Sequence, residues 1–155
     1  MKSALACLAL LISCGPVIAD EAATNAARQK AFTERLSNTT LTGSFTVDTK
    51  LDAPPKPERY EIEKVSRLTG NLYTFLVRIK YGSVDSRVPI TVPVVWADGT
   101  PMISLTDQRL PGMQGKFSAR VIFHGDRYVG TWQHDAVGGH MFGVIKKNKP
   151  ADAEK

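Results

Sequence analysis

The segment from Lys116 to Ile145 constrains the fold more than any other part of the sequence. Apolar residues occupy every second position from Phe117 to Phe123, which is typical of a strand with one face in a core. Gly125-Asp126 then interrupts the alternation with two residue types that tolerate the positive φ of a tight turn. The segment therefore predicts a hairpin, and a third run follows after a looser connection at Asp135–Gly139.

Five further alternating runs precede this segment, and residues that favour turns separate them. The predicted strands are Thr40–Thr49, Arg59–Leu68, Leu72–Tyr81, Arg87–Trp96, Pro101–Thr106, Phe117–His124, Arg127–Gln133 and Met141–Ile145. About eight strands with short connections favour an all-β fold, an antiparallel meander closed into a small barrel, because closure leaves no exposed sheet edge. A β-sandwich is the alternative.

Two of the predicted strands carry local irregularities. Val65 is out of phase with the preceding part of its strand, which predicts a β-bulge near Glu63. Pro89 and Pro93 lie on the same face of another strand and lack a backbone N–H. We therefore expect that strand to be partly unpaired along one side.

Residues 1–19 predict a secretory signal peptide. Their apolar run, Ala4–Ile12, is shorter than the roughly 20 residues that a helix needs to cross a bilayer. Cleavage before Asp20 would give a secreted or periplasmic protein without a transmembrane segment. Leu11-Ile12-Ser13-Cys14 resembles the lipobox of bacterial lipoproteins, so a lipid anchor on Cys14 is the alternative. Both cysteines lie in this segment, so the mature soluble form is expected to have no disulfide.

The chain predicts one domain, because 155 residues with 43% hydrophobic content are enough for a single core. Residues 20–38 are rich in helix formers and predict an N-terminal helix or linker. Its Phe32 and Leu36 would pack as a narrow stripe, or the helix would serve as a spacer. Residues 39–147 are assigned to the barrel, and residues 148–155 to a disordered basic and polar tail.

Composition and motifs argue against several functional classes. The net charge is +5, and the basic residues are scattered along the chain apart from Lys146, Lys147 and Lys149 near its end. Neither zinc spacing nor an aromatic-and-basic RNA signature is present, so no nucleic-acid partner is expected. The sequence also lacks a nucleophile elbow, a phosphate loop and paired catalytic carboxylates. We therefore expect a non-enzymatic protein without a cofactor.

The three histidines, His124, His134 and His140, all lie near the C-terminal end of the chain. At ~3.3 Å per strand residue, His124 and His134 would lie at opposite ends of the sheet. His134, Asp135 and His140 flank one predicted loop and are the candidates for a metal or general-base site. Surface polar residues beside a glycine-rich loop explain them equally well.

The interior of an eight-stranded barrel is wide enough either to fill with side chains or to hold one small ligand. If a cavity is present, aromatic residues at inward positions are expected to form its wall. These candidate ligand-binding residues are Phe45, Tyr73, Phe75, Trp96, Phe117, Tyr128 and Trp132. The glycines of Gly43-Ser44-Phe45 and Gly130-Thr131-Trp132 are expected to let aromatic rings lie over bare backbone.

The chain resembles an uncharacterised family of small exported bacterial proteins. The resemblance covers most of the mature chain and lies in the signal, the short helix, Gly43-Ser44-Phe45-Thr46-Val47, Arg59-Tyr60, Gly125-Asp126-Arg127-Tyr128, Gly130-Thr131-Trp132 and Gly138-Gly139-His140-Met141-Phe142-Gly143. It implies an exported protein and carries no known activity.

The strand count and the glycine–aromatic spacing are also similar to the calycin superfamily of lipocalin-like ligand-binding barrels. Lipocalins place a glycine-x-tryptophan on the first strand, whereas this chain has Phe45 there and Gly130-Thr131-Trp132 on the penultimate strand. The resemblance implies a calycin-like barrel and leaves the class of ligand open.

Three functional hypotheses follow. The leading one is an exported barrel that binds a small apolar or amphipathic ligand, or a cell-envelope component, in its interior or at one mouth. The second is a structural or protein-interaction module of the envelope with a filled core. The third is a metal- or His-dependent enzyme.

Overall fold

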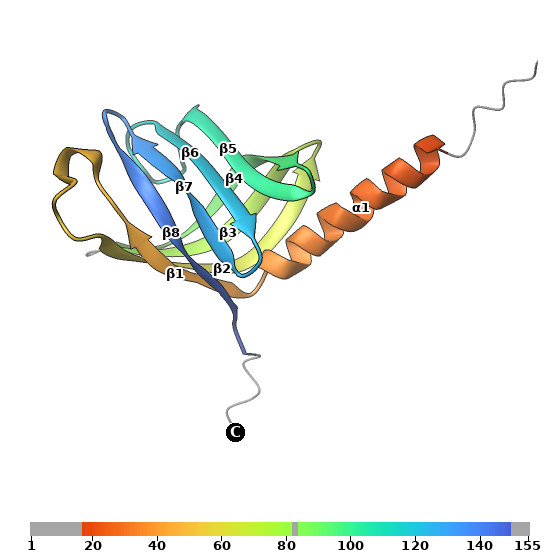
Figure 1. Cartoon of the computed structure of the whole chain (residues 1–155), viewed down its shortest axis with the longest axis horizontal. Coiled ribbons are helices and arrows are strands. Elements are labelled where there is room, and N and C mark those ends of the chain that lie inside the picture. Colours follow the sequence, from red (N-terminus) through yellow and green to blue (C-terminus); the bar gives the residue numbers. More distant parts are fainter. Residues whose placement is uncertain (1–16, 82–83, 150–155) are drawn as a thin grey trace, which may run out of the picture.

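The computed structural model describes residues 17–81 and 84–149 and shows a closed antiparallel barrel preceded by a helix (Figure 1). The helix is α1 (Val17–Leu36), and a short 3-10 turn, η1 (Asp48–Lys50), follows the first strand. The strands are β1 (Thr39–Phe45), β2 (Lys56–Thr69), β3 (Leu72–Tyr81), β4 (Val84–Ala97), β5 (Thr100–Gln108), β6 (Phe117–His124), β7 (Arg127–His134) and β8 (Val137–Lys147).

Each strand pairs with the next in the chain, and β8 pairs with β1 to close the barrel. The predicted meander and its closure into a barrel are therefore confirmed, and the sandwich alternative is wrong. Most of the predicted signal peptide, including Cys14, lies outside the described residues, as do residues 150–155 of the predicted tail. Within the described part of the chain, no helix has both the length and the apolar character needed to cross a membrane.

Both predicted irregularities are present. The pairing of β2 with β3 shifts register between Ile62 and Lys64, which is the bulge expected near Glu63. In β4, only Val94–Ala97 pairs with β5, whereas residues 84–93 pair with β3 alone. The two prolines therefore lie in a strand that is unpaired along most of one side, and the barrel wall has a seam between β4 and β5.

The predicted loose connection at Asp135–Gly139 is wrong. The connection is a tight turn at Asp135-Ala136, in which Asp135 has a φ of 50°, and β8 begins at Val137. Gly138 and Gly139 belong to β8, where they pair with Gln133 and Trp132 of β7. Gly139 lies where there is no room for a side chain. A Cβ on Gly139 would collide with the carbonyl oxygen of Thr46 and lie 2.9 Å from Trp132 Nε1.

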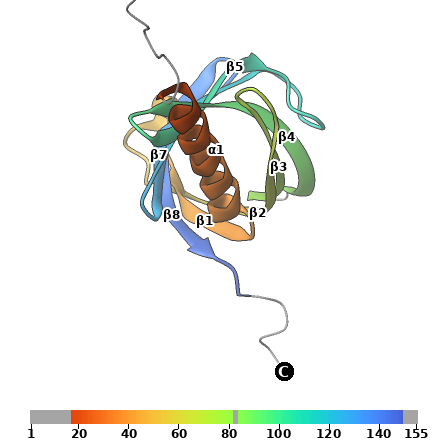
Figure 2. The same cartoon turned by 90° about the vertical axis from the view of Figure 1, so that its right-hand side faces the viewer.

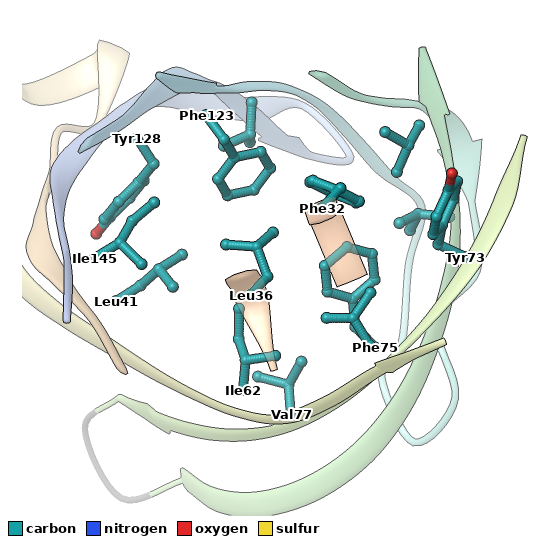
Figure 3. Packing of buried hydrophobic residues seen from close by; sticks show 14 of the residues in the cluster. Phe32, Leu36, Leu41, Ile62, Tyr73, Phe75, Val77, Phe123, Tyr128 and Ile145 are labelled. Carbon is teal, nitrogen blue, oxygen red and sulfur yellow. The ribbon is translucent and has the colours of Figure 1, made fainter. Parts of the chain in front are cut away.

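The C-terminal end of α1 closes one end of the barrel, while the rest of the helix extends away from the strands (Figures 1 and 2). Phe32 and Leu36 enter the interior, where they are 4% and 0% exposed, and Figure 3 shows them in the middle of the core. The Nζ atom of Lys147 donates to the carbonyl oxygens of Glu34 and Ser37, at 2.7 and 2.6 Å. The helix is thus a plug, because Phe32 and Leu36 are buried in the barrel and Lys147 of β8 caps its C-terminal end.

Candidate functional site

The end of the barrel next to α1 is filled. The ring of Phe32 meets those of Tyr73, Phe75 and Trp96 edge-on, with centroids 5.4, 6.3 and 5.5 Å apart. These three residues were expected to line a ligand cavity. The structure places them inside the barrel, where the ring of Phe32 from the chain's own helix packs against them.

At the opposite end of the barrel, the inward aromatic side chains are less completely covered. Phe45, Phe117 and Trp132 occupy inward positions near that end, but each is only half-buried. Phe45 meets Trp132 edge-on at 5.8 Å, and Trp132 Nε1 donates to the Thr46 carbonyl oxygen at 3.2 Å. Inward side chains of a closed barrel meet solvent only through an end or a gap in the wall. These three side chains are therefore partly open to solvent, whereas most of the rings around Phe32 are buried.

The seam between β4 and β5 lies toward the same end. Inward residues beside the seam are Val88 and Ile90 on β4 and Ile103 on β5, and all three are half-buried. Leu110, in the connection between β5 and β6, packs against the same core. The interior beside the seam is therefore apolar and partly exposed.

A carboxylate cluster, defined here as Glu58, Tyr60 and Tyr128, lies inside the barrel. Glu58 is 5% exposed. Its Oε1 accepts a hydrogen bond from the Tyr128 hydroxyl and its Oε2 accepts one from the Tyr60 hydroxyl, both at 2.8 Å. Tyr128 is 1% exposed, whereas Tyr60 is half-buried. Only the Tyr60 side of the cluster approaches solvent.

Two glycines make the contact between Tyr128 and Glu58 possible across the two intervening strands, β8 and β1. Glu58 on β2 is opposite Gly43 on β1, Gly43 is opposite Gly143 on β8, and Gly143 is opposite Tyr128 on β7. A Cβ on Gly43 would collide with the Tyr128 hydroxyl, and a Cβ on Gly143 would lie 2.7 Å from Tyr128 Cε1. The tyrosine side chain crosses bare backbone to reach the carboxylate.

The same arrangement holds Trp132, which lies over Gly139 of β8 and reaches the end of β1. The expectation that glycines allow aromatic packing is correct, but the glycines under these rings lie on neighbouring strands. Gly130 has another role, because a Cβ there would collide with the backbone of Arg120 on β6.

Burial raises the pKa of Glu58, and the hydrogen bonds from Tyr128 and Tyr60 offset part of that effect. Burial also raises the pKa of Tyr128, and the neighbouring Glu58 carboxylate raises it further. No lysine, arginine or histidine among the described side chains forms an ion pair with Glu58. The carboxylate is held by two neutral donors.

The histidine candidates are not brought together. His134, at the end of β7, stacks on Phe117 at 4.1 Å, and its Nε2 lies 3.7 Å from Asp135 Oδ2. His140 lies on the outer face of β8, with its Nδ1 3.9 Å from Asp48 Oδ1 and beside a shallow groove of about 630 Å³. His124 is at the other end of the β6–β7 hairpin, as predicted. Within the described residues, no group of three or more histidine, cysteine, aspartate or glutamate side chains is placed to hold a metal ion.

Sequence reasoning did not single out Glu58 or Tyr60. The predicted strand began at Arg59, one residue too late to include the glutamate. The available signal was the alternation of Glu58 with Tyr60 and Ile62, which puts a charged residue at an inward position.

Comparison with known proteins found no match: no family model, no curated protein and no solved structure is significantly similar to this chain. A barrel fold by itself does not define a function, which must be argued from the site.

Proposed function

We propose that the barrel binds a small amphipathic molecule through the end opposite α1. The observation that carries the proposal is the partial exposure of Phe45, Phe117 and Trp132, three inward aromatic side chains at that end. Ligand sites are mostly apolar, with a few polar groups that fix orientation. The aromatic side chains would supply the apolar surface, and the carboxylate cluster would supply the polar group.

The α1 plug supports a binding role. With Phe32 and Leu36 buried at one end, a ligand would enter only from the other end or through the β4–β5 seam. The proposal includes export, as expected from residues 1–19, either to a secreted or periplasmic location or as a lipoprotein anchored through Cys14.

Native mass spectrometry of protein purified from its own source tests the proposal. We expect a retained small molecule that dissociates on unfolding. The matched variants are Trp132→Phe, at the open end, and Trp96→Phe, at the plugged end. Ligand retention should fall only in the first. Protein that carries no small molecule, and binds none from a lipid extract of the source, would contradict the proposal.

The outer face favours a second candidate function. Ile122, Val129 and Phe142 are 38%, 52% and 46% exposed and lie directly opposite one another on β6, β7 and β8. The exposed Arg127 and Lys146 lie beside the same face. We propose that this outer row docks on an anionic lipid surface, because apolar side chains beside cations are typical of such contacts.

A second copy of the chain fits this row less well, because a symmetric contact would bring Arg127 and Lys146 of the two copies near one another. Flotation with vesicles that contain or lack an anionic lipid tests the docking. Binding should require the anionic lipid and should weaken in Phe142→Ser, while Leu68→Ser, an exposed leucine on β2, should bind normally. Equal binding by both variants, or self-association in place of binding, would overturn the lipid proposal.

A further inference from the structure

We infer that the ligand of the open end is an amphipathic cation whose protonated amine binds the Glu58 carboxylate while its apolar part lies against Phe45 and Trp132. The inference rests on the proposed function and names the chemical class of the ligand. The observation behind it is the inward carboxylate of Glu58, which is 5% exposed and has no cationic partner among the described side chains.

Among the described residues, Glu58 accepts two hydrogen bonds, fewer than its carboxylate can accept. An ionised carboxylate has about four lone-pair sites, and the two tyrosine hydroxyls occupy one on each oxygen. Buried charges in proteins are normally paired, because removing an unpaired ion from water is costly. An ammonium group has three N–H donors and a positive charge that would pair with the Glu58 carboxylate.

A ligand would approach the Glu58 carboxylate from the side of Oε2. Tyr128 covers Oε1 and is itself fully enclosed over Gly43 and Gly143, so a ligand does not reach Glu58 from that direction. Oε2 is bonded to Tyr60, which is half-buried and so, unlike Tyr128, is partly exposed to solvent. An ammonium group would bind Oε2 beside the Tyr60 hydroxyl.

The surrounding groups favour a cation over other head groups. Tyrosine and tryptophan rings attract cations through their faces, with contributions of about 0.5 to 2 kcal/mol. A ligand carboxylate would be repelled by Glu58, because two carboxylates at one site disfavour ionisation of both. A neutral alcohol would supply one donor and no charge. The site thus discriminates by charge and not only by shape.

Three probes with the same ten-carbon tail test the inference: decylamine, decan-1-ol and decanoate. Binding is followed by titration calorimetry at neutral pH, below the critical micelle concentration of each probe. We expect decylamine to bind about tenfold or more tightly than decan-1-ol, and decanoate to bind most weakly. A tenfold difference corresponds to about 1.4 kcal/mol.

Glu58→Gln should abolish the preference for decylamine over decan-1-ol, whereas Glu61→Gln, on the outer face of the same strand, should leave it intact. Circular dichroism and thermal unfolding check that both variants fold. The comparison of probes on the unchanged protein is decisive even if Glu58→Gln does not fold.

Equal binding of decylamine and decan-1-ol would overturn the cation inference and leave the proposed function standing. Binding of none of the three probes would overturn both.

Discussion

Glu58 loses its hydration inside the barrel, and within the described part of the chain its carboxylate gains two hydroxyl donors, Tyr60 and Tyr128. The balance of these two effects raises the pKa of its carboxyl, because desolvation outweighs the hydrogen bonds. A carboxylate in this position stabilises the fold less than an uncharged side chain of the same shape would. Retaining a glutamate that lowers the stability of the fold in this way is consistent with a functional role for Glu58.

The raised pKa of Glu58 predicts a specific dependence of stability on pH. The folded protein holds the Glu58 proton more tightly than the unfolded chain does. The resulting stabilisation is complete below the unfolded pKa of about 4.3 and is lost as pH rises through the higher folded pKa. Urea unfolding between about pH 4 and pH 8 should show this decline in the unchanged protein and a flatter profile in Glu58→Gln. Coincident profiles would contradict the assignment.

The hydrogen bond from Tyr128 gives a second prediction at this scale. Tyr128→Phe keeps the ring over the glycines but leaves Glu58 Oε1 without its donor. We expect a loss of about 1 to 3 kcal/mol in unfolding free energy at neutral pH. In the Glu58→Gln background the same change should cost less, because the bond to a charged acceptor is already gone. Equal costs in the two backgrounds would show that the pair is not coupled.

At the scale of elements, the barrel depends on strands that approach closely where glycines face inward. Gly43 and Gly143 form a cross-strand pair beneath the Tyr128 ring, and Gly139 lies beneath Trp132. Aromatic residues on β7 thereby reach β1 and β2 across β8 and hold the closing strands together. Side chains at these glycine positions would force the strands apart.

Two glycines of β8 make a matched comparison. A Cβ on Gly143 would lie 2.7 Å from Gly43 Cα and from Tyr128 Cε1, so Gly143→Ala should destabilise the fold by about 1 to 3 kcal/mol or more. A Cβ on Gly138 would lie 3.2 Å from its nearest neighbours, so Gly138→Ala should change stability by less than about 1 kcal/mol. Urea unfolding of both variants measures the difference. Equal destabilisation would exclude the ring-over-glycine explanation.

The α1 plug gives a further prediction. Leu36 is fully buried in the barrel, so Leu36→Ala should lower the unfolding free energy by about 2 to 5 kcal/mol. Ala31→Ser, on an exposed part of the same helix, should change it by less than about 0.5 kcal/mol. A neutral Leu36→Ala would mean that the helix does not close the barrel in solution.

The elements were largely predictable because their signals are local. Alternation located the strands, the phase change at Val65 located the bulge, and Pro89 with Pro93 indicated the unpaired side of β4. Gly138 and Gly139 were wrongly predicted to lie in a connection, because glycine is common in turns. Their role depends on Trp132 and Thr46, which are distant in sequence.

The site was less predictable than the fold for the same reason. Inward aromatic residues follow from alternation, so all the predicted wall residues were found on strands. Whether each is covered depends on α1, and alternation in the strands does not show that Phe32 fills one end. The contact between Glu58 and Tyr128 joins residues 70 positions apart and needs the closed order of strands.

At the scale of the whole molecule, the barrel has two unlike ends. One is closed by α1, which β8 caps through Lys147. The other is framed by half-buried aromatic side chains and the β4–β5 seam, with the carboxylate cluster inside. The central claim is that a small amphipathic molecule binds at the second end.

The two tryptophans provide the most direct measurement, because each end of the barrel has one. Decylamine is titrated into uniformly ¹⁵N-labelled protein while the two indole N–H signals are followed by nuclear magnetic resonance. The Trp132 signal should shift and saturate as its surroundings at the open end change, while the Trp96 signal beside Phe32 should stay in place. A Trp132 signal that remains fixed while the protein binds the probe, or a shift confined to Trp96, would contradict the claim.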